Sequence, residues 1–136
     1  MVQGIHHINF IVRDLTTALP VWERILNRPV TRFDRLAQRN VELANFDVDG
    51  IWIVLVQPTG PGVPADHLAA HGEGFFLLSF GVDSLDAECA RLGEAMLSGA
   101  ARSGLDNWTV QDLQFEQTFG AQLQLVQEGV VKEGSR

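Results

Sequence analysis

The sequence predicts an α+β fold built from two tandem β-α-β-β-β modules, and the main evidence is an internal repeat. The segments 50–57 and 120–127 read GIWIVLVQ and GAQLQLVQ, which share the first Gly and the final Leu-Val-Gln at an offset of 70 residues. At the same offset, INFIVRDL at 8–15 aligns with LSFGVDSL at 78–85, with identical residues at three pairs of positions. Two matches at one offset indicate that one structural unit is duplicated.

The first module begins with a strand and a helix. Ile5–Val12 is rich in β-branched and apolar residues, which favours a strand, and Asp14 then offers a helix N-cap. Apolar residues at helical spacing follow and mark one face, namely Leu15, Leu19, Trp22 and Leu26. Pro20 lies inside this helix and has no backbone N–H, so we expect an irregular or kinked first half.

Three strands complete the first module, and the second module repeats the same order. These three strands are expected at Val30–Arg35, Val41–Val48 and Ile51–Gln57, with a tight turn at Asp49-Gly50. The proline-rich stretch Pro58–His67 is the natural linker. In the second module we expect a strand at Phe75–Val82, a helix at about Asp86–Gly93, and strands within Ala95–Ser103, at Trp108–Phe115 and at Ala121–Gln127. The tail after Glu128 is expected to fray.

The composition is that of a globular protein and argues against several kinds of partner. Apolar residues make up 46% and charged residues 20% of the 136 residues, which is enough for one domain with a substantial core. The net charge of −7 argues against nucleic acid and against anionic membrane surfaces as partners. The sequence has no apolar run of membrane-spanning length and no signal-peptide pattern at its start, so the expected location is cytoplasmic.

Two stretches resemble a known family, HHINFIVRDL at 6–15 and HLAAHGEGFFLLSFGVDSLDAECARL at 67–92. With the repeated modules, they resemble the vicinal oxygen chelate superfamily of glyoxalases, bleomycin-resistance proteins and dioxygenases, and most of all its methylmalonyl-CoA epimerase-like members. The resemblance covers essentially the whole chain. It implies one glyoxalase-like domain over 1–136, with module one at about 1–58, a linker at about 58–74, module two at about 75–128 and a tail at 129–136. It also implies a cupped eight-stranded mixed sheet around one cavity, and a homodimer.

Enzymes of this superfamily hold a divalent metal with four side chains, one from the first and one from the last strand of each module. The resemblance places these four positions at His7, Val54, Leu77 and Gln124, and the repeat offset relates the first to the third and the second to the fourth. Val and Leu side chains have no atom that coordinates a metal. We therefore expect no metal cofactor; if a metal is present, His7 and Gln124 are its candidate ligands.

Strand alternation predicts which other side chains share the cavity surface with His7. The predicted ligand-binding residues are Asn9, Trp52, Val54, Phe75, Leu77, Ser79, Gln122 and Gln124. This mixture of an apolar wall with uncharged polar groups suits a neutral organic molecule. A coenzyme A thioester would need basic groups near the cavity mouth, and Arg32, Arg35 and Arg39 are candidates for that role.

The function predicted from these residues is a metal-independent small-molecule binding protein, or a cofactor-free enzyme, that takes a largely apolar ligand. In an enzyme of this kind, His7 and Asp112 are the candidate catalytic residues for proton transfer. The alternative is a divalent-metal-dependent isomerase or lyase of the methylmalonyl-CoA epimerase or glyoxalase I type. A third reading is a structural domain in which the aromatic side chains fill the cavity, His7 is a half-buried strand histidine and Asp112 is a solvated strand-edge carboxylate.

Overall fold

A computed structural model describes residues 1–129 of the chain. The strands are β1 (Val2–Ile11), β2 (Arg32–Leu36), β3 (Val41–Val48), β4 (Ile51–Pro58), β5 (Gly74–Val82), β6 (Leu97–Ser103), β7 (Thr109–Leu113) and β8 (Leu123–Gln127). The helices are α1 (Leu15–Leu26), α2 (Val63–His71) and α3 (Leu85–Leu92), with short 3-10 turns at Ala37–Arg39, Glu94–Met96 and Phe115–Thr118. The predicted frayed tail lies outside the described residues, apart from Gly129.

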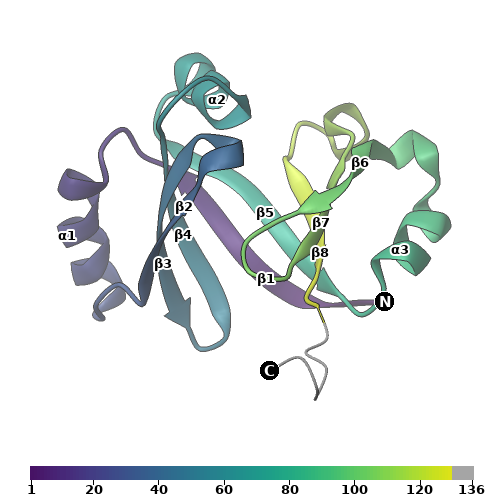
Figure 1. The fold of residues 1–136 in the computed structure, drawn as a ribbon, viewed down its shortest axis with the longest axis horizontal. Helices are drawn as coiled ribbons and strands as arrows, with labels where there is room; N and C mark the ends of the chain where they lie inside the picture. The colour runs from purple at the N-terminus through teal and green to yellow at the C-terminus, as the bar shows by residue number, and fades with distance from the viewer. Residues whose placement is uncertain (130–136) are drawn as a thin grey trace. The chain divides into compact units, whose positions relative to one another are not determined.

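The strands have the order β2-β3-β4-β1-β5-β8-β7-β6 (Figure 1). The pairs β1/β4 and β5/β8 are parallel, whereas β2/β3, β3/β4, β6/β7 and β7/β8 are antiparallel. The predicted α+β class with an eight-stranded mixed sheet is therefore confirmed. The cavity that the resemblance implies stays a prediction. Among residues 1–129, no helix has both the length and the apolar character needed to cross a membrane.

The chain forms two compact units that divide inside β1 and β5. The amino-terminal unit is His7–Leu77, and the carboxy-terminal unit begins at Leu78 and also contains Met1–His6. In the amino-terminal unit, α1 covers one face of the strands, because its apolar side chains pack on Ala44, Phe46 and Leu55 (Figure 1). The opposite face of these strands carries a second buried cluster that includes Ile11, Val41, Leu43, Val54, Val56, Phe76 and Leu77.

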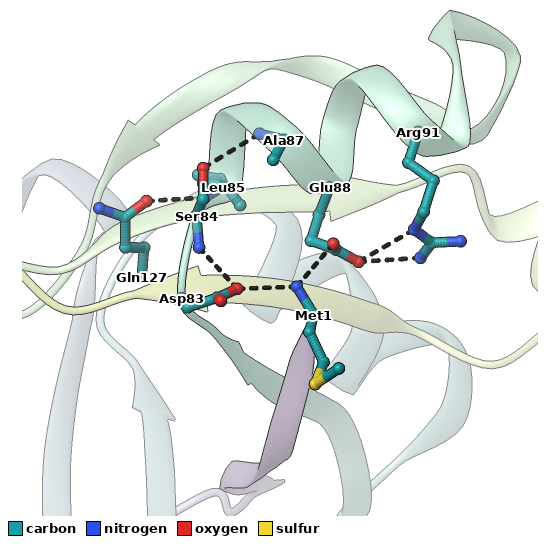
Figure 2. A network of polar contacts seen from close by, with 8 residues as sticks. All are labelled: Met1, Asp83, Ser84, Leu85, Ala87, Glu88, Arg91 and Gln127. Carbon is teal, nitrogen blue, oxygen red and sulfur yellow. Dashed lines mark hydrogen bonds and ion pairs between the residues drawn. The ribbon is translucent and has the colours of Figure 1, made fainter.

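The carboxy-terminal unit has a smaller apolar core under α3. Val82 of β5, Leu85 of α3 and Leu125 of β8 form its buried centre. The α-amino group of Met1 lies beside α3, 2.7 Å from Asp83 Oδ1 and 2.8 Å from Glu88 Oε2 (Figure 2). Arg91 also pairs with Glu88, at 2.9 Å, so that a carboxylate with 6% exposure contacts two cations.

The repeated glutamine at the end of each module has a structural role. Gln57 Oε1 accepts a hydrogen bond from the backbone N–H of Leu15 at 2.8 Å, and Gln127 Oε1 accepts one from Leu85 at 2.7 Å (Figure 2). Both acceptors therefore satisfy the first N–H of a helix, which has no partner inside the helix itself. The Leu-Val-Gln repeat is accounted for by this duplicated strand-to-helix contact.

Two local expectations differ from the structure. The stretch predicted as a linker contains α2, whose single internal proline, Pro64, lies in the first turn, where a missing N–H costs no helix hydrogen bond. The predicted irregularity at Pro20 does not interrupt α1, which is one helix from Leu15 to Leu26. Asp14 caps α1 as predicted, because its Oδ1 accepts from the Thr16 N–H at 2.9 Å.

Candidate functional site

His7 and Asn9 lie on β1 of the amino-terminal unit, beside the strand that carries Trp52 and Val54. The parallel register pairs His7 with Trp52 and Asn9 with Val54. His7 is 5% exposed, and Asn9 is half-buried. The Oδ1 atom of Asn9 is buried without a hydrogen-bond partner in the described part of the chain. A polar atom in this state is a candidate contact for a bound molecule.

The two apolar residues at the metal-ligand positions are part of a hydrophobic core. Val54 and Leu77 are both buried in the cluster with Ile11, and Trp52 packs against that cluster. Their side chains supply no oxygen, nitrogen or sulfur. The amino-terminal unit therefore keeps a donor only at His7 among its three metal-ligand positions.

The structure corrects the placement of Phe75. Alternation predicted that Phe75 shares a face with Leu77, but Phe75 is 49% exposed and its ring lies 6.2 Å from the ring of Phe10. Phe10 packs on the α1 side, and the buried neighbour of Leu77 in the core cluster is Phe76. Strict alternation fails at the start of β5, because the consecutive residues Phe76 and Leu77 both enter one cluster. The role of Phe75 in ligand binding stays a prediction.

The carboxy-terminal unit carries a row of polar side chains across β5, β8, β7 and β6, which we call the polar row: Ser79, Gln124, Asp112 and Arg102. Ser79 is opposite Gln124, and Gln124 is opposite Asp112. Gln124 Nε2 donates to Asp112 Oδ1 at 3.2 Å, and Arg102 contacts both Asp112 oxygens at 3.0 to 3.2 Å. Ser79 is 0% and Gln124 5% exposed. The structure therefore brings three predicted site residues together and adds Arg102.

Two acceptor atoms in the polar row have no partner. Ser79 Oγ and Gln124 Oε1 are buried and make no hydrogen bond within residues 1–129. Leaving a buried polar atom unpaired costs about 1–3 kcal/mol. In contrast, both carboxylate oxygens of Asp112 accept hydrogen bonds from Arg102, and one also accepts from Gln124. This arrangement suits a role in orienting Gln124 better than a role as a proton acceptor. Gln122 is half-buried just before β8, and its backbone carbonyl accepts from the Leu78 N–H at 3.1 Å.

Sequence reasoning missed a matching polar group in the amino-terminal unit. Asn45 on β3 is opposite Val54, as Asp112 is opposite Gln124. Asn45 is buried, and its Nδ2 donates to Asp34 Oδ2 at 2.7 Å. Arg32 binds the same carboxylate at 2.7 and 2.9 Å. The signal was available, because Arg32 and Asp34 have opposite charges and alternation places them on one strand face.

The metal-ligand positions do not fit a four-ligand divalent site. Two of the four side chains are hydrocarbon, and one of the other two is an amide that already donates to Asp112. Within the described range, no group of three or more His, Cys, Asp or Glu side chains is arranged to hold a metal ion. The donor set therefore disagrees with the metal chemistry that the resemblance implies.

An open groove of about 440 Å³ lies in the amino-terminal unit, and its lining contains none of the predicted ligand-binding residues, although it contains Arg35. It is lined by Leu15, Phe33, Asp34, Arg35, Glu42 and Leu43. The charged side chains in its lining already form ion pairs, because Asp34 pairs with Arg32 and Arg35 pairs with Glu42. We assign no ligand to this groove.

Comparison with known proteins gives one family match and several structural matches. The family model of the glyoxalase/bleomycin resistance protein/dioxygenase superfamily matches residues 6–111. The chain is similar to methylmalonyl-CoA epimerase from Mycobacterium tuberculosis, with 25% identity, a TM-score of 0.85 and coverage of 95% of this chain and 90% of that chain. No protein of curated function matches the sequence.

Two further structural matches share the fold at lower identity. One is a variant of Streptomyces coelicolor methylmalonyl-CoA epimerase in complex with 2-nitronate-propionyl-CoA, at 21% identity, TM-score 0.86 and coverage of 96% of this chain and 100% of that chain. The other is a hypothetical protein from Bacillus halodurans, at 19% identity, TM-score 0.86 and coverage of 95% and 96%. Because the family model spans most of the sequence, the protein belongs to the glyoxalase/bleomycin resistance protein/dioxygenase superfamily.

Proposed function

We propose that the protein is a metal-independent member of its superfamily that binds a small, uncharged and largely apolar organic molecule. The observation that carries this proposal is a pair of buried polar atoms without partners in the carboxy-terminal unit, Ser79 Oγ and Gln124 Oε1. The amino-terminal unit has a third such atom, Asn9 Oδ1. All three belong to predicted site residues. Unpaired buried atoms lower the stability of the ligand-free protein, so their retention is explained if a ligand pairs with them.

Three arginine side chains are already paired with carboxylates, which favours an uncharged ligand. Arg32 is bound to Asp34 and Arg35 to Glu42, so each guanidinium already has a carboxylate partner. Arg102 is likewise bound to Asp112. Cations that are neutralised within the protein gain less from a phosphate or a carboxylate of a ligand. A neutral molecule with one or two hydrogen-bonding groups therefore suits the site better than a coenzyme A thioester does.

Binding without catalysis is the preferred form of the proposal. Asp112 has a cation on both carboxylate oxygens and an amide on one of them, so it is poorly placed to take a proton from a ligand. His7 remains the one candidate proton-transfer residue among the predicted site residues. A cofactor-free enzyme would therefore depend on His7, and the replacement His7→Gln would abolish its activity.

The experiment is a screen of neutral small molecules by thermal shift, followed by calorimetry on any hit. Ser79→Ala should weaken binding by about 1–2 kcal/mol while leaving the ligand-free protein as stable or more stable, because it removes an unpaired buried hydroxyl. A ligand held by the amino-terminal unit should instead lose affinity in Trp52→Phe. Trp22→Phe is the matched control, since Trp22 packs under α1 against Phe10, at a ring distance of 4.7 Å, and should bind normally.

Two results would overturn the proposal. The first is an unstable Ser79→Ala protein, which would mean that the hydroxyl already has a stabilising partner. The second is a ligand whose affinity is unchanged in both Ser79→Ala and Trp52→Phe, since such a molecule binds elsewhere. The homodimer and the cytoplasmic location remain predictions, and light scattering on purified protein tests the first of them.

A second candidate function is a metal-dependent isomerase or lyase, and the similarity to methylmalonyl-CoA epimerases over 95% of the chain favours it. It requires His7, Gln124 and ligands not identified in the described residues. The test is exchange of the C2 proton of methylmalonyl-CoA for deuterium, with and without a chelator. Exchange that needs added metal and disappears in His7→Ala would establish this function and exclude the metal-independent one.

A further inference from the structure

Two histidines lie side by side on α2, a helix that contributes none of the predicted site residues. His67 and His71 are one helical turn apart, and their ring centroids are separated by 4.7 Å with an interplanar angle of 43°. His71 is exposed and His67 is half-buried. Residues four apart on a helix share one face, so both imidazoles are directed to the same side of α2.

The ring of His67 is held in place by its surroundings. It packs edge-on against Phe76, at a centroid distance of 4.8 Å. The pKa of His67 lies below its usual value, because burial and then His71 disfavour the charged form, while a hydrogen bond with the Phe75 backbone acts in the other direction. When a histidine uses one ring nitrogen for a backbone hydrogen bond, the other nitrogen stays neutral and has a fixed orientation. Metal-binding histidines have this arrangement, because the neutral nitrogen coordinates the metal.

We propose that His67 and His71 form a two-imidazole site for one divalent transition-metal ion, with Cu²⁺ bound most tightly. Two histidines at this spacing on one helix face chelate a single ion in known metal motifs. Imidazole suits Cu²⁺, Ni²⁺ and Zn²⁺, and Cu²⁺ stands highest in the general affinity order. The described residues provide no third His, Cys, Asp or Glu ligand in such a group, so water completes the coordination.

This site is independent of the proposed small-molecule function, and it changes how a metal analysis of the protein should be interpreted. Metal retained after purification would be assigned by family resemblance to His7 and Gln124. A site on α2 would give the same metal content with no metal at those positions. The location of the metal therefore has to be established before metal content is used to choose between the two candidate functions.

The test is Cu²⁺ titration of the untagged full chain by calorimetry, with electron paramagnetic resonance of the bound ion. We expect one tight ion per chain with a two-nitrogen signature. The key variant combines His71→Ala with Ala69→His, which keeps the number of histidines and moves one off the shared face at an exposed position. It should weaken Cu²⁺ binding by at least about tenfold, because the two imidazoles no longer act together.

His7→Ala and His6→Ala serve as matched controls and should bind Cu²⁺ as the unmodified protein does. All of these proteins have the same amino terminus, so weak binding there contributes equally to each titration. Unchanged binding in the displaced-histidine variant would overturn the proposal. Loss of binding in His7→Ala alone would also overturn it and would point to a metal at the family positions instead.

Discussion

The two modules share their structural contacts and differ at the positions that are predicted to face a ligand. Gln57 and Gln127 make the same hydrogen bond to a helix amino terminus, at 2.8 and 2.7 Å. In contrast, Val54 lies in a hydrophobic cluster, whereas its repeat partner Gln124 lies in the polar row. The contacts that fix each helix on its strands are thus common to both copies, while the predicted site positions differ between the copies.

The turns of the two modules also share a backbone conformation but differ in residue type. Asp49-Gly50 and Phe119-Gly120 both have positive φ values, 51° and 92° in the first pair and 57° and 85° in the second. Asp is favoured in this conformation, whereas a bulky residue is strained there. Phe119 is also 99% exposed. The second hairpin therefore places an aromatic side chain in solvent at a position where the backbone disfavours it.

The largest effects are expected from matched truncations in the two cores. Leu55 and Leu125 occupy equivalent repeat positions and are both buried, under α1 and α3 respectively. Each Leu→Ala change should lower the free energy of unfolding by about 2–5 kcal/mol. We expect the larger loss at Leu55, because Trp22 and the other α1 side chains around it leave less freedom to close the cavity. Urea denaturation measures both values.

The exposed Val21 of α1 is the control for these truncations. Val21→Ala removes methyl groups from the same helix without opening a buried cavity, so it should change stability by less than about 0.5 kcal/mol. A loss at Leu125 that clearly exceeds the loss at Leu55 would contradict the ranking of the two cores.

The next effect concerns the shared glutamines. Gln57→Leu and Gln127→Leu each remove an acceptor from a half-buried helix N–H and should cost about 1–2 kcal/mol, with nearly equal values in the two modules. Gln→Glu at either position should restore stability, since a carboxylate accepts the same bond and also favours the helix amino terminus. Thermal unfolding of the four variants measures the effect. A cost confined to one module would show that the repeated glutamine is structural in only that copy.

The hairpin comparison predicts a gain in stability. Phe119→Asn should stabilise the protein by about 1 kcal/mol, because Asn tolerates the left-handed conformation better than Phe does. Asp49→Asn, the matched change in the first hairpin, should have almost no effect. Chemical denaturation compares the two proteins. A destabilised Phe119→Asn protein would mean that the Phe119 ring makes contacts that its 99% exposure does not suggest.

The sequence repeat predicted the succession of the eight strands and of two helices along the chain, because hydrophobic periodicity and turn residues act locally. It could not align the two hairpins, since Asn45 is nine residues before Val54, whereas Asp112 is twelve before Gln124. An offset of 70 therefore matches Asp112 with Glu42, although Asn45 is the residue in the equivalent register position. The buried Asn45–Asp34 contact was missed for this reason.

Phe75 was misplaced because alternation describes regular strands only. Two consecutive residues of β5, Phe76 and Leu77, enter the same cluster, and this shifts the side-chain pattern by one at the strand's beginning. No residue type in the segment signals the shift. The pattern of burial along a strand depends on what packs against it, here Leu68 of α2. Helix α2 was not predicted, because it lies in a proline-rich stretch.

The smallest expected effect is a difference in how the two units respond to pH. Burial and His71 lower the pKa of His67, so its neutral form is favoured in the folded protein. The associated stability is complete above the unfolded value of 6.5 and is lost as the pH falls through the folded value. The amino-terminal unit should therefore loosen first on acidification, and His67→Gln should remove this step. Hydrogen exchange of the α2 amides measures it.

The carboxy-terminal unit should respond at the two ends of the pH range instead. Contacts with the Met1 ammonium group lower the pKa of Asp83 and of Glu88, so their stabilisation is lost only as the pH falls below the unfolded values of 3.8 and 4.5. The same contacts raise the pKa of the ammonium group above 8.0, and its contribution is lost as the pH rises through that raised value. As the pH falls below 6.5 but stays above 4.5, the α3 amides should therefore stay protected while those of α2 lose protection. Equal exchange of both helices at every pH would contradict this separation and would mean that the two units respond to acid as one.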